Sequence, residues 1–209
     1  MMANSDSTSA IGKLLHMIMN FDAKRKPRIV LGACGSVAAM KFGLVLRALS
    51  EWAEVKAVVT KTALQFLANE KAESMFEVIF CDDHDWKNRK KIGDSVLHIE
   101  LAKWADIIVI APLSAHTAAK IAGGLCDNLL TSIVRAWDYE KPMFVAPSMD
   151  GCMWRNPFTE QNFMSIEELG VTLIPPVQHM QTNMREMADP STISSTVKSF
   201  YDSKILKDK

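Results

Sequence analysis

The residues best suited to chemistry are glycine, hydroxyl and basic residues that directly follow short apolar segments. Gly35, Ser36 and Val37 stand where a helical pattern begins. Free backbone N–H groups and the positive end of a helix dipole favour a phosphate at such a position. The same turn could equally be a simple tight turn in which Ser36 is the helix N-cap. Because it has neither the dinucleotide-binding nor the Walker glycine spacing, an ordinary nucleotide site is disfavoured.

Two further turns carry polar side chains. Thr60 and Lys61 offer a hydroxyl and an ammonium group, although a helix cap beside a surface lysine would look the same. The other turn follows a continuous apolar run and consists of Ser114, Ala115, His116 and Thr117. Polar groups directly after so apolar a run indicate a binding site.

Three other residues are candidates for contact with a reacting molecule. His98 lies between apolar residues, as a structural histidine usually does, and a role as general acid or base depends on its geometry. Asp150 and Met153 lie in the turn Pro-Ser-Met-Asp-Gly-Cys-Met-Trp, which ends at Trp154. This turn could form a lid over a ligand, or Met153 and Trp154 could fill the core.

The segments that must position these turns alternate between strand and helix. Strand patterns occur at 28–33, 54–60, 76–80, 106–111, 143–146 and 171–174, and helical patterns at 37–49, 63–68, 97–105, 117–121, 129–137, 157–169 and 191–201. This alternation predicts an α/β fold with a parallel sheet of about six strands and helices on both faces. Ligands of such sheets bind beyond the carboxyl ends of the strands, where the turns described above lie.

We expect one folded domain over residues 28–203. Residues 1–27 are predicted to be an appendage that is partly disordered or forms a short helix, and residues 204–209 a C-terminal tail. A chain of 209 residues buries enough surface to fold without a metal or disulfide.

Composition excludes several kinds of partner. The chain has 24 Lys plus Arg and 24 Asp plus Glu, and this balance argues against a nucleic-acid surface. No run approaches the roughly 18 apolar residues of a membrane span. The four cysteines match no zinc spacing, so no metal site is predicted. They are expected to be reduced thiols in the cytoplasm, or alternatively in the nucleus.

Several segments resemble the flavin-dependent cysteine decarboxylases, above all the plant phosphopantothenoylcysteine decarboxylases, or Hal3 proteins. The likeness covers about residues 26–197 and is carried by stretches such as GSVAAMKFG, WADIIVIAPLSA, KIAGGLCDNLLTSIVRAWDY and LGVTLIPP. It implies a flavodoxin-like Rossmann fold, FMN between subunits, and a homotrimer or a mixed trimer with a paralogue. The family acts on cysteinyl acids, from which it releases CO2, and some members serve coenzyme A biosynthesis.

The resemblance also implies roles for individual residues. The FMN-binding residues would be Gly35, Ser36, Val37, Thr60, Lys61, Ser114, Ala115, His116, Thr117 and Ala146. His98 would be the catalytic histidine, and Asp150 and Met153 would contact the substrate.

The chain departs from the family pattern at four places. Asp150 replaces an asparagine that binds the substrate carboxylate, His116 replaces an asparagine of the flavin turn, and Cys34 replaces a serine. Residues 178–187 contain neither the cysteine that donates a proton in the family nor the glycines beside it. These changes predict a diverged decarboxylase with an altered substrate or incomplete chemistry. The alternatives are a non-catalytic, Hal3-like regulatory or assembly subunit, and a pathway enzyme that tolerates the changes.

Overall fold

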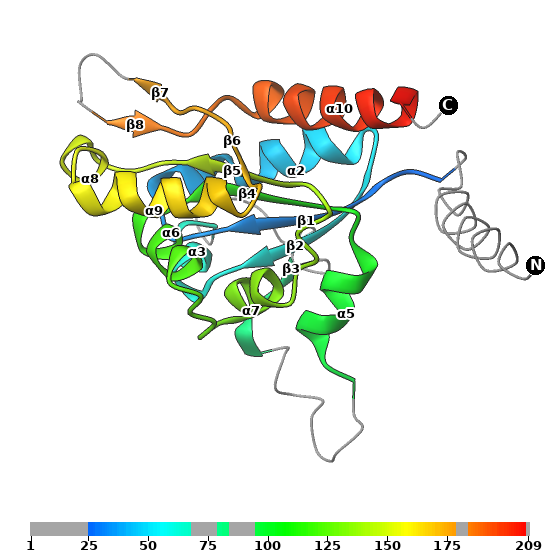
Figure 1. Cartoon of the computed structure of the whole chain (residues 1–209), viewed down its shortest axis with the longest axis horizontal. Coiled ribbons are helices and arrows are strands. Elements are labelled where there is room, and N and C mark those ends of the chain that lie inside the picture. Colours follow the sequence, from blue (N-terminus) through cyan, green and yellow to red (C-terminus); the bar gives the residue numbers. More distant parts are fainter. Residues whose placement is uncertain (1–24, 68–78, 84–94, 179–183, 208–209) are drawn as a thin grey trace, which may run out of the picture.

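A six-stranded parallel sheet forms the centre of the molecule (Figure 1). The computed structural model describes residues 25–67, 79–83, 95–178 and 184–207. The strands are β1 (Arg28–Ala33), β2 (Glu54–Val59), β3 (Ile79–Phe80), β4 (Ile107–Leu113), β5 (Met143–Pro147) and β6 (Thr172–Leu173). Their order is β3-β2-β1-β4-β5-β6. Successive strands are therefore added toward one edge of the sheet as far as β3, and from β4 onward they are added toward the other edge. This is the order of the doubly wound Rossmann fold, and it confirms the predicted parallel α/β sheet.

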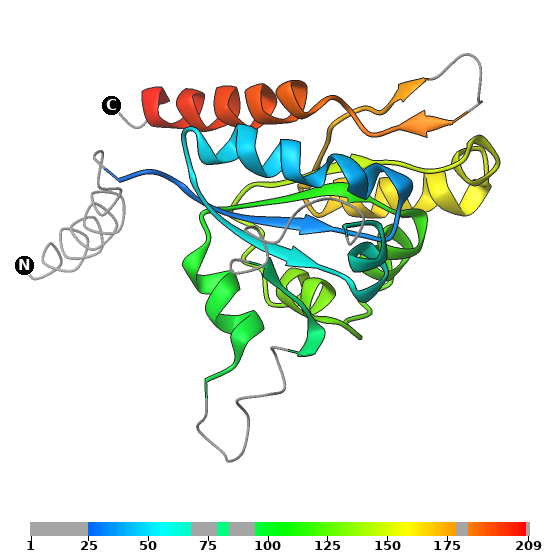
Figure 2. The same ribbon diagram turned by 180° about the vertical axis from the view of Figure 1, so that it is seen from behind.

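Helices cover both faces of the sheet (Figure 2). The helices on one face are η1 (Val37–Lys41), α2 (Phe42–Ser50), α3 (Lys61–Leu67) and α10 (Pro190–Lys207). The helices on the other face are α5 (Leu97–Trp104), α6 (Ala115–Ala122), α7 (Leu129–Arg135) and α9 (Pro157–Glu168). Successive residues of β4 alternate between the two cores, with Val109 in one and Ile110 in the other, and both are fully buried. Because β4 is buried on both faces, its sequence is a continuous apolar run.

Some elements differ from the prediction. The helix expected over 37–49 divides into the 3₁₀ turn η1 and the helix α2, because the side chain of Ser36 caps a tight first turn by accepting the N–H of Ala38 at 3.3 Å. Helix α10 continues to Lys207, so residues 204–207 are helical and not a separate tail. Within the predicted appendage, Arg25 donates two 2.8 Å hydrogen bonds to Asp106, and residues 1–24 lie outside the described residues.

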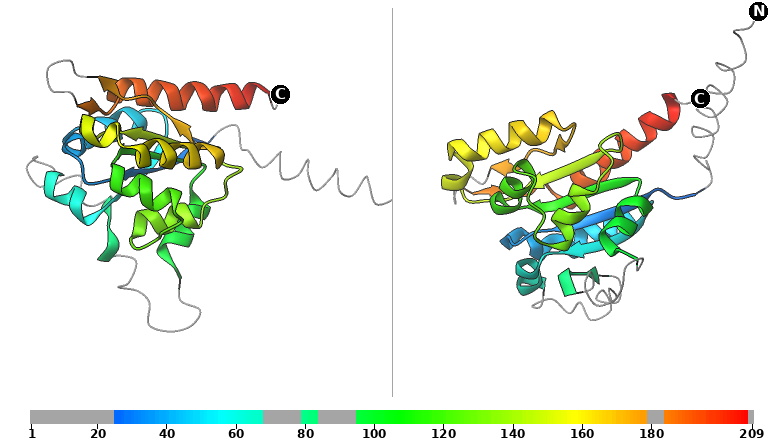
Figure 3. Two further views of the ribbon diagram at one scale, coloured as in Figure 1. Left: turned by 60° about the vertical axis from the view of Figure 1, so that its left-hand side comes forward. Right: turned by 60° about the horizontal axis from the view of Figure 1, so that its bottom comes forward.

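Three short elements escaped the sequence prediction because each spans only about one period of its pattern, too little for a repeat to be visible. They are the helix α8 (Gly151–Trp154) and the antiparallel strands β7 (Val177–Gln178) and β8 (Arg185–Glu186). The β7–β8 hairpin lies at the same end of the molecule as α8 (Figure 3). An isolated bridge between Met149 and Arg185 joins the two regions.

Backbone hydrogen bonds hold the carboxyl ends of four strands together. The N–H of Cys34 donates to Pro112 O at 3.1 Å, that of Thr60 to Ala33 O at 3.0 Å, and that of Ser148 to Leu113 O at 3.0 Å. The predicted turns after β1, β2, β4 and β5 therefore share one edge of the sheet. Among the described residues, no helix has the length and apolar character that crossing a membrane requires.

Candidate functional site

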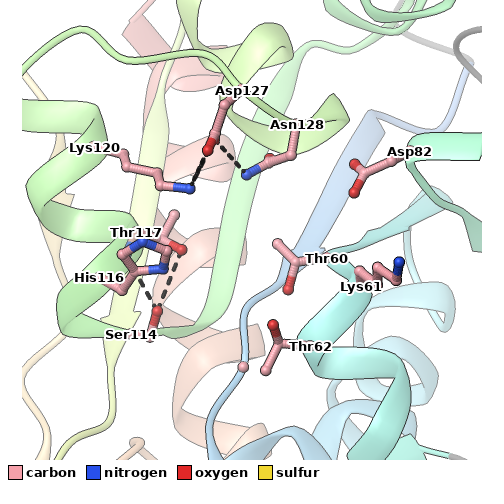
Figure 4. Close-up of a pocket in the computed structure, with 11 residues that line it drawn as sticks. Thr60, Lys61, Thr62, Asp82, Ser114, His116, Thr117, Lys120, Asp127 and Asn128 are labelled. Atoms are coloured by element: carbon pink, nitrogen blue, oxygen red, sulfur yellow. Dashed lines mark hydrogen bonds and ion pairs between the residues drawn. The ribbon is translucent and has the colours of Figure 1, made fainter.

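A cavity of about 240 Å³ opens at the carboxyl ends of β1, β2 and β4. Its lining residues are Gly35, Thr60, Lys61, Thr62, Asp82, Ser114, His116, Thr117, Lys120, Asp127 and Asn128 (Figure 4). Six of them were predicted from the sequence, namely Gly35, Thr60, Lys61, Ser114, His116 and Thr117. The cavity lies where the strand order reverses, which is the usual ligand position in open α/β sheets.

One wall of the cavity depends on a glycine. A Cβ atom at Gly35 would lie 2.5 Å from Thr62 Cγ2 and 2.7 Å from Thr62 Cβ, so only glycine allows this close approach to α3. Thr60 closes the same wall, since its Oγ1 accepts the N–H of Ala63 at 3.3 Å and caps α3. Lys61, the first residue of α3, is exposed to solvent.

The opposite wall is the start of α6. Ser114 caps this helix, because its Oγ accepts the N–H of Thr117 at 3.2 Å. The Ser114 hydroxyl also donates to Thr117 Oγ1 at 3.2 Å. Thr117 is buried and His116 is exposed. The two hydroxyls are thus held side by side before any ligand binds.

Lys120 and Asp127 form an ion pair at the rim. Lys120 Nζ lies 2.6 Å from Asp127 Oδ2 and 2.8 Å from Oδ1. The hydrogen bond from Lys120 is the main reason that the pKa of Asp127 is lowered. Asp82 Oδ1 accepts the N–H of Leu129 at 2.8 Å, and Asn128 caps α7. Sequence reasoning did not assign these rim residues, although Asp127 and Asn128 shortly follow the glycine pair Gly123-Gly124.

The thiol of Cys34 lies beneath the cavity and is completely buried. Burial raises its pKa, and hydrogen bonds with Thr117 and Ser114 offset this only in part. The side chain is therefore a neutral thiol that supports the hydroxyl pair.

A second polar region lies beside the cavity, in the turn that follows β5. The Ser36 hydroxyl donates to Ser148 Oγ at 3.1 Å, which ties the turn after β1 to this one. Asp150 is the N-cap of α8 and accepts the N–H of Cys152 at 2.7 Å. This hydrogen bond is the main cause that lowers the pKa of Asp150, so its carboxylate is ionised at neutral pH.

Sequence comparison identifies the family. The profile of the Flavoprotein family matches residues 18–202. The chain belongs to the flavoprotein family. Phosphopantothenoylcysteine decarboxylase HAL3a of Glycine max is 55% identical over 207 residues, which are 97% of this chain and 96% of that protein.

Solved structures support the same flavoprotein fold. The FMN binding protein AtHal3 has 55% identity and a TM-score of 0.79, and the likeness covers 86% of this chain and 98% of that chain. A mutant PPC decarboxylase complexed with pantothenoylaminoethenethiol has 54% identity and a TM-score of 0.78, over 85% of this chain and all of that one (100%).

Several residues that the flavoprotein resemblance assigned lie outside the cavity. Among the proposed cofactor residues these are Ser36, Val37, Ala115 and Ala146. Ser36 is engaged with Ser148, Val37 points outward with 57% of its surface exposed, and Ala146 is fully buried in the core. The alternative interpretation of Ser36 as a helix N-cap is confirmed, and contact of Ala146 with a ring stays a prediction.

The predicted catalytic and substrate residues also lie outside. His98 is half-buried in the first turn of α5, a helix that packs against α7. Met153 is exposed over half of its surface and does not fill the core, whereas Trp154 packs on Phe163 at 5.6 Å between ring centroids. The structure therefore brings six of the ten FMN candidates together around one cavity, and His98, Asp150 and Met153 are not among the residues that line it.

Proposed function

We propose that this flavoprotein is an FMN-dependent carboxy-lyase that decarboxylates phosphopantothenoylcysteine or a related cysteinyl acid, a step of coenzyme A biosynthesis. The observation that carries the proposal is the meeting of six residues, predicted for FMN, in one cavity at the switch point of the sheet. The chain is similar over nearly all its length to proteins named for this decarboxylation.

The donor set of the cavity fits FMN. Hydroxyls from Thr60, Ser114 and Thr117 suit a phosphate and a polyol chain, and Lys61 supplies positive charge. Gly35 lines the cavity without a side chain, and Thr62 occupies the position that a Cβ would need. Both carboxylates of the lining are already engaged, one with Lys120 and the other with the N–H of Leu129. The ion pair with Lys120 offsets the charge of Asp127.

The chain's own residues position the reaction. When bound, FMN supplies the electron acceptor that makes loss of CO2 from a cysteinyl acid feasible. Ser114 and Thr117 hold and orient their ligand through hydroxyls that are fixed beforehand, which reduces the entropy cost of binding. The neutral thiol of Cys34 underneath adds no charge. We assign the transfer of a proton during the reaction to His98.

We propose that a homotrimer, or a mixed trimer with a paralogue, completes the site. The cavity of about 240 Å³ lies below the roughly 300–1,000 Å³ of typical ligand pockets, so a second subunit would cover the cofactor. His98, which does not line the cavity of its own chain, would then serve a neighbouring one. Exposed apolar side chains at Val37, Met40 and Leu44 follow helical spacing and offer a surface for assembly.

The cytoplasm is the compartment that we propose, with the nucleus as the alternative. All four cysteines are free thiols, which suits a reducing compartment.

The test is to load the purified protein with FMN, remove excess by gel filtration, and measure flavin absorption and CO2 release from phosphopantothenoylcysteine. Retained flavin with CO2 release supports the decarboxylase. Loss of all flavin from a folded protein would refute the proposal.

A non-catalytic regulatory or assembly subunit is the second candidate. The ionised carboxylate at Asp150 and the lack of cysteine in residues 178–187 favour it. Retained flavin without CO2 release from any cysteinyl acid would identify this role.

A further inference from the structure

The β7–β8 hairpin is fastened to the turn after β5 at two points. The N–H of Met149 donates to Arg185 O at 3.0 Å, and the N–H of Arg185 donates to Met149 O at 3.0 Å. The next residue, Glu186, lies 3.5 Å from Lys41 Nζ, which is on η1. These contacts fix the backbone of Arg185 directly beside the turn that contains Asp150.

The side chain of Arg185 is oriented by an aromatic ring. Its Cζ lies 5.6 Å from the centroid of the Trp154 ring, and that ring packs in turn on Phe163. Within the described part of the chain, no hydrogen bond or ion pair engages the guanidinium group. Arg185 is half-buried, so its five N–H donors are held in a defined place and remain available.

The charged groups around the turn 147–154 leave Arg185 as the donor for an acidic substrate. The carboxylate of Asp150 is ionised, accepts the N–H of Cys152, and can donate nothing to a substrate. Lys41 is already paired with Glu186. Phosphopantothenoylcysteine carries two oxyanions, a phosphate and a carboxylate, and a planar guanidinium group binds either one with two parallel hydrogen bonds.

We infer that Arg185 is a specificity-determining residue that binds an oxyanion of the substrate, its carboxylate or its phosphate, beside the turn 147–154. This inference rests on the proposed function and deepens it, since it selects acidic cysteinyl substrates. The contact acts on binding. A guanidinium group that holds a carboxylate stabilises the bound acid at least as much as the state in which CO2 leaves, so KM changes more than kcat.

The experiment uses the FMN-loaded full chain and two probes that separate the oxyanions. Pantothenoylcysteine carries only the carboxylate, and 4′-phosphopantetheine carries only the phosphate. Calorimetric titration of Arg185→Gln should give a Kd roughly 10- to 100-fold weaker than wild type for one of the two probes, the loss expected for a hydrogen bond to a charged group. The affected probe identifies the oxyanion. Arg185→Lys should recover part of the affinity, because it restores the charge without the paired donors.

Two control variants separate a direct contact from a loosened hairpin. Arg47→Gln removes an exposed arginine on α2 and should leave both affinities unchanged. Glu186→Gln breaks the ion pair with Lys41 but keeps the guanidinium group, and should weaken binding less than threefold. Unchanged affinities in Arg185→Gln, an equal loss in Glu186→Gln, or no binding of either probe to the wild-type protein would each overturn the inference. Flavin absorption and CO2 release of the wild-type protein, measured in parallel, test the proposed function separately.

Discussion

Replacing Gly35 with alanine should destabilise the protein and weaken FMN binding together. The added Cβ would lie 2.7 Å from the Cβ of Thr62, an atom that cannot rotate away because it is bonded to the backbone of α3. Overpacking of this kind costs about 1–3 kcal/mol. For a domain of this size the melting temperature should fall by roughly 2–12 °C. The loop after β1 must move to relieve the contact, and the cavity changes shape with it.

A double-mutant cycle with Thr62 isolates the contact. Thr62→Ala removes the Cγ2 atom at 2.5 Å but keeps Cβ, so it should rescue Gly35→Ala only in part. Thr62→Gly removes both atoms and should restore the loop, at a cost of about 1 kcal/mol for glycine in a helix. We expect a coupling free energy within the 0.5–3 kcal/mol usual for residues in contact.

The assay is thermal unfolding followed by circular dichroism, with FMN affinity from quenching of flavin fluorescence. Gly123→Ala is the matched control, because its Cβ would meet its nearest neighbour, Ala119 O, at 3.3 Å, where a small shift suffices. A Gly35→Ala protein with unchanged melting temperature and FMN affinity would refute the reasoning, since the close approach to Thr62 would then carry no cost.

Three further outcomes are expected. Asp150→Asn should tighten phosphopantothenoylcysteine binding about tenfold, because the amide gains a donor and loses a like charge. Its melting temperature should not change, since the two residues are equivalent N-caps; unchanged affinity, measured by calorimetry, would mean that this side chain does not face the substrate. His98→Asn should retain flavin absorption and lose roughly 10²–10⁴-fold in the rate of CO2 release, and full activity would remove the histidine from the mechanism. Burial raises the pKa of Cys34 above its ordinary value of 9.0, so above that pH the unfolded chain loses a proton that the folded one keeps. Wild type should therefore lose up to about 1.4 kcal/mol of stability per pH unit relative to Cys34→Ser, and urea unfolding at pH 8 and pH 10 that shows a constant difference would contradict this.

Local patterns in the sequence determined the fold class and six of the eleven residues that line the cavity. The apolar runs of β1 and β4 are buried on both faces, so successive residues of each run are apolar and the strand is visible in the sequence. Parallel strands end at one edge, so Gly35, Thr60 and Ser114 could be expected to meet there, and they do. The family resemblance also indicated the flavoprotein assignment without any coordinates.

Only the tertiary structure decided which side chains engage one another. Lys120 and Asp127 are close because the loop that follows α6 turns back toward Lys120, and no periodic pattern in the sequence predicts this ion pair. The same holds for Ser36, whose type suits a phosphate turn equally well but whose hydroxyl is directed to Ser148. Arg185 lies on the two-residue strand β8, which has no periodic pattern, and its guanidinium group packs on the ring of Trp154. Periodicity reports the burial of a residue within its own element, whereas such pairings depend on the packing of segments that are far apart in the chain.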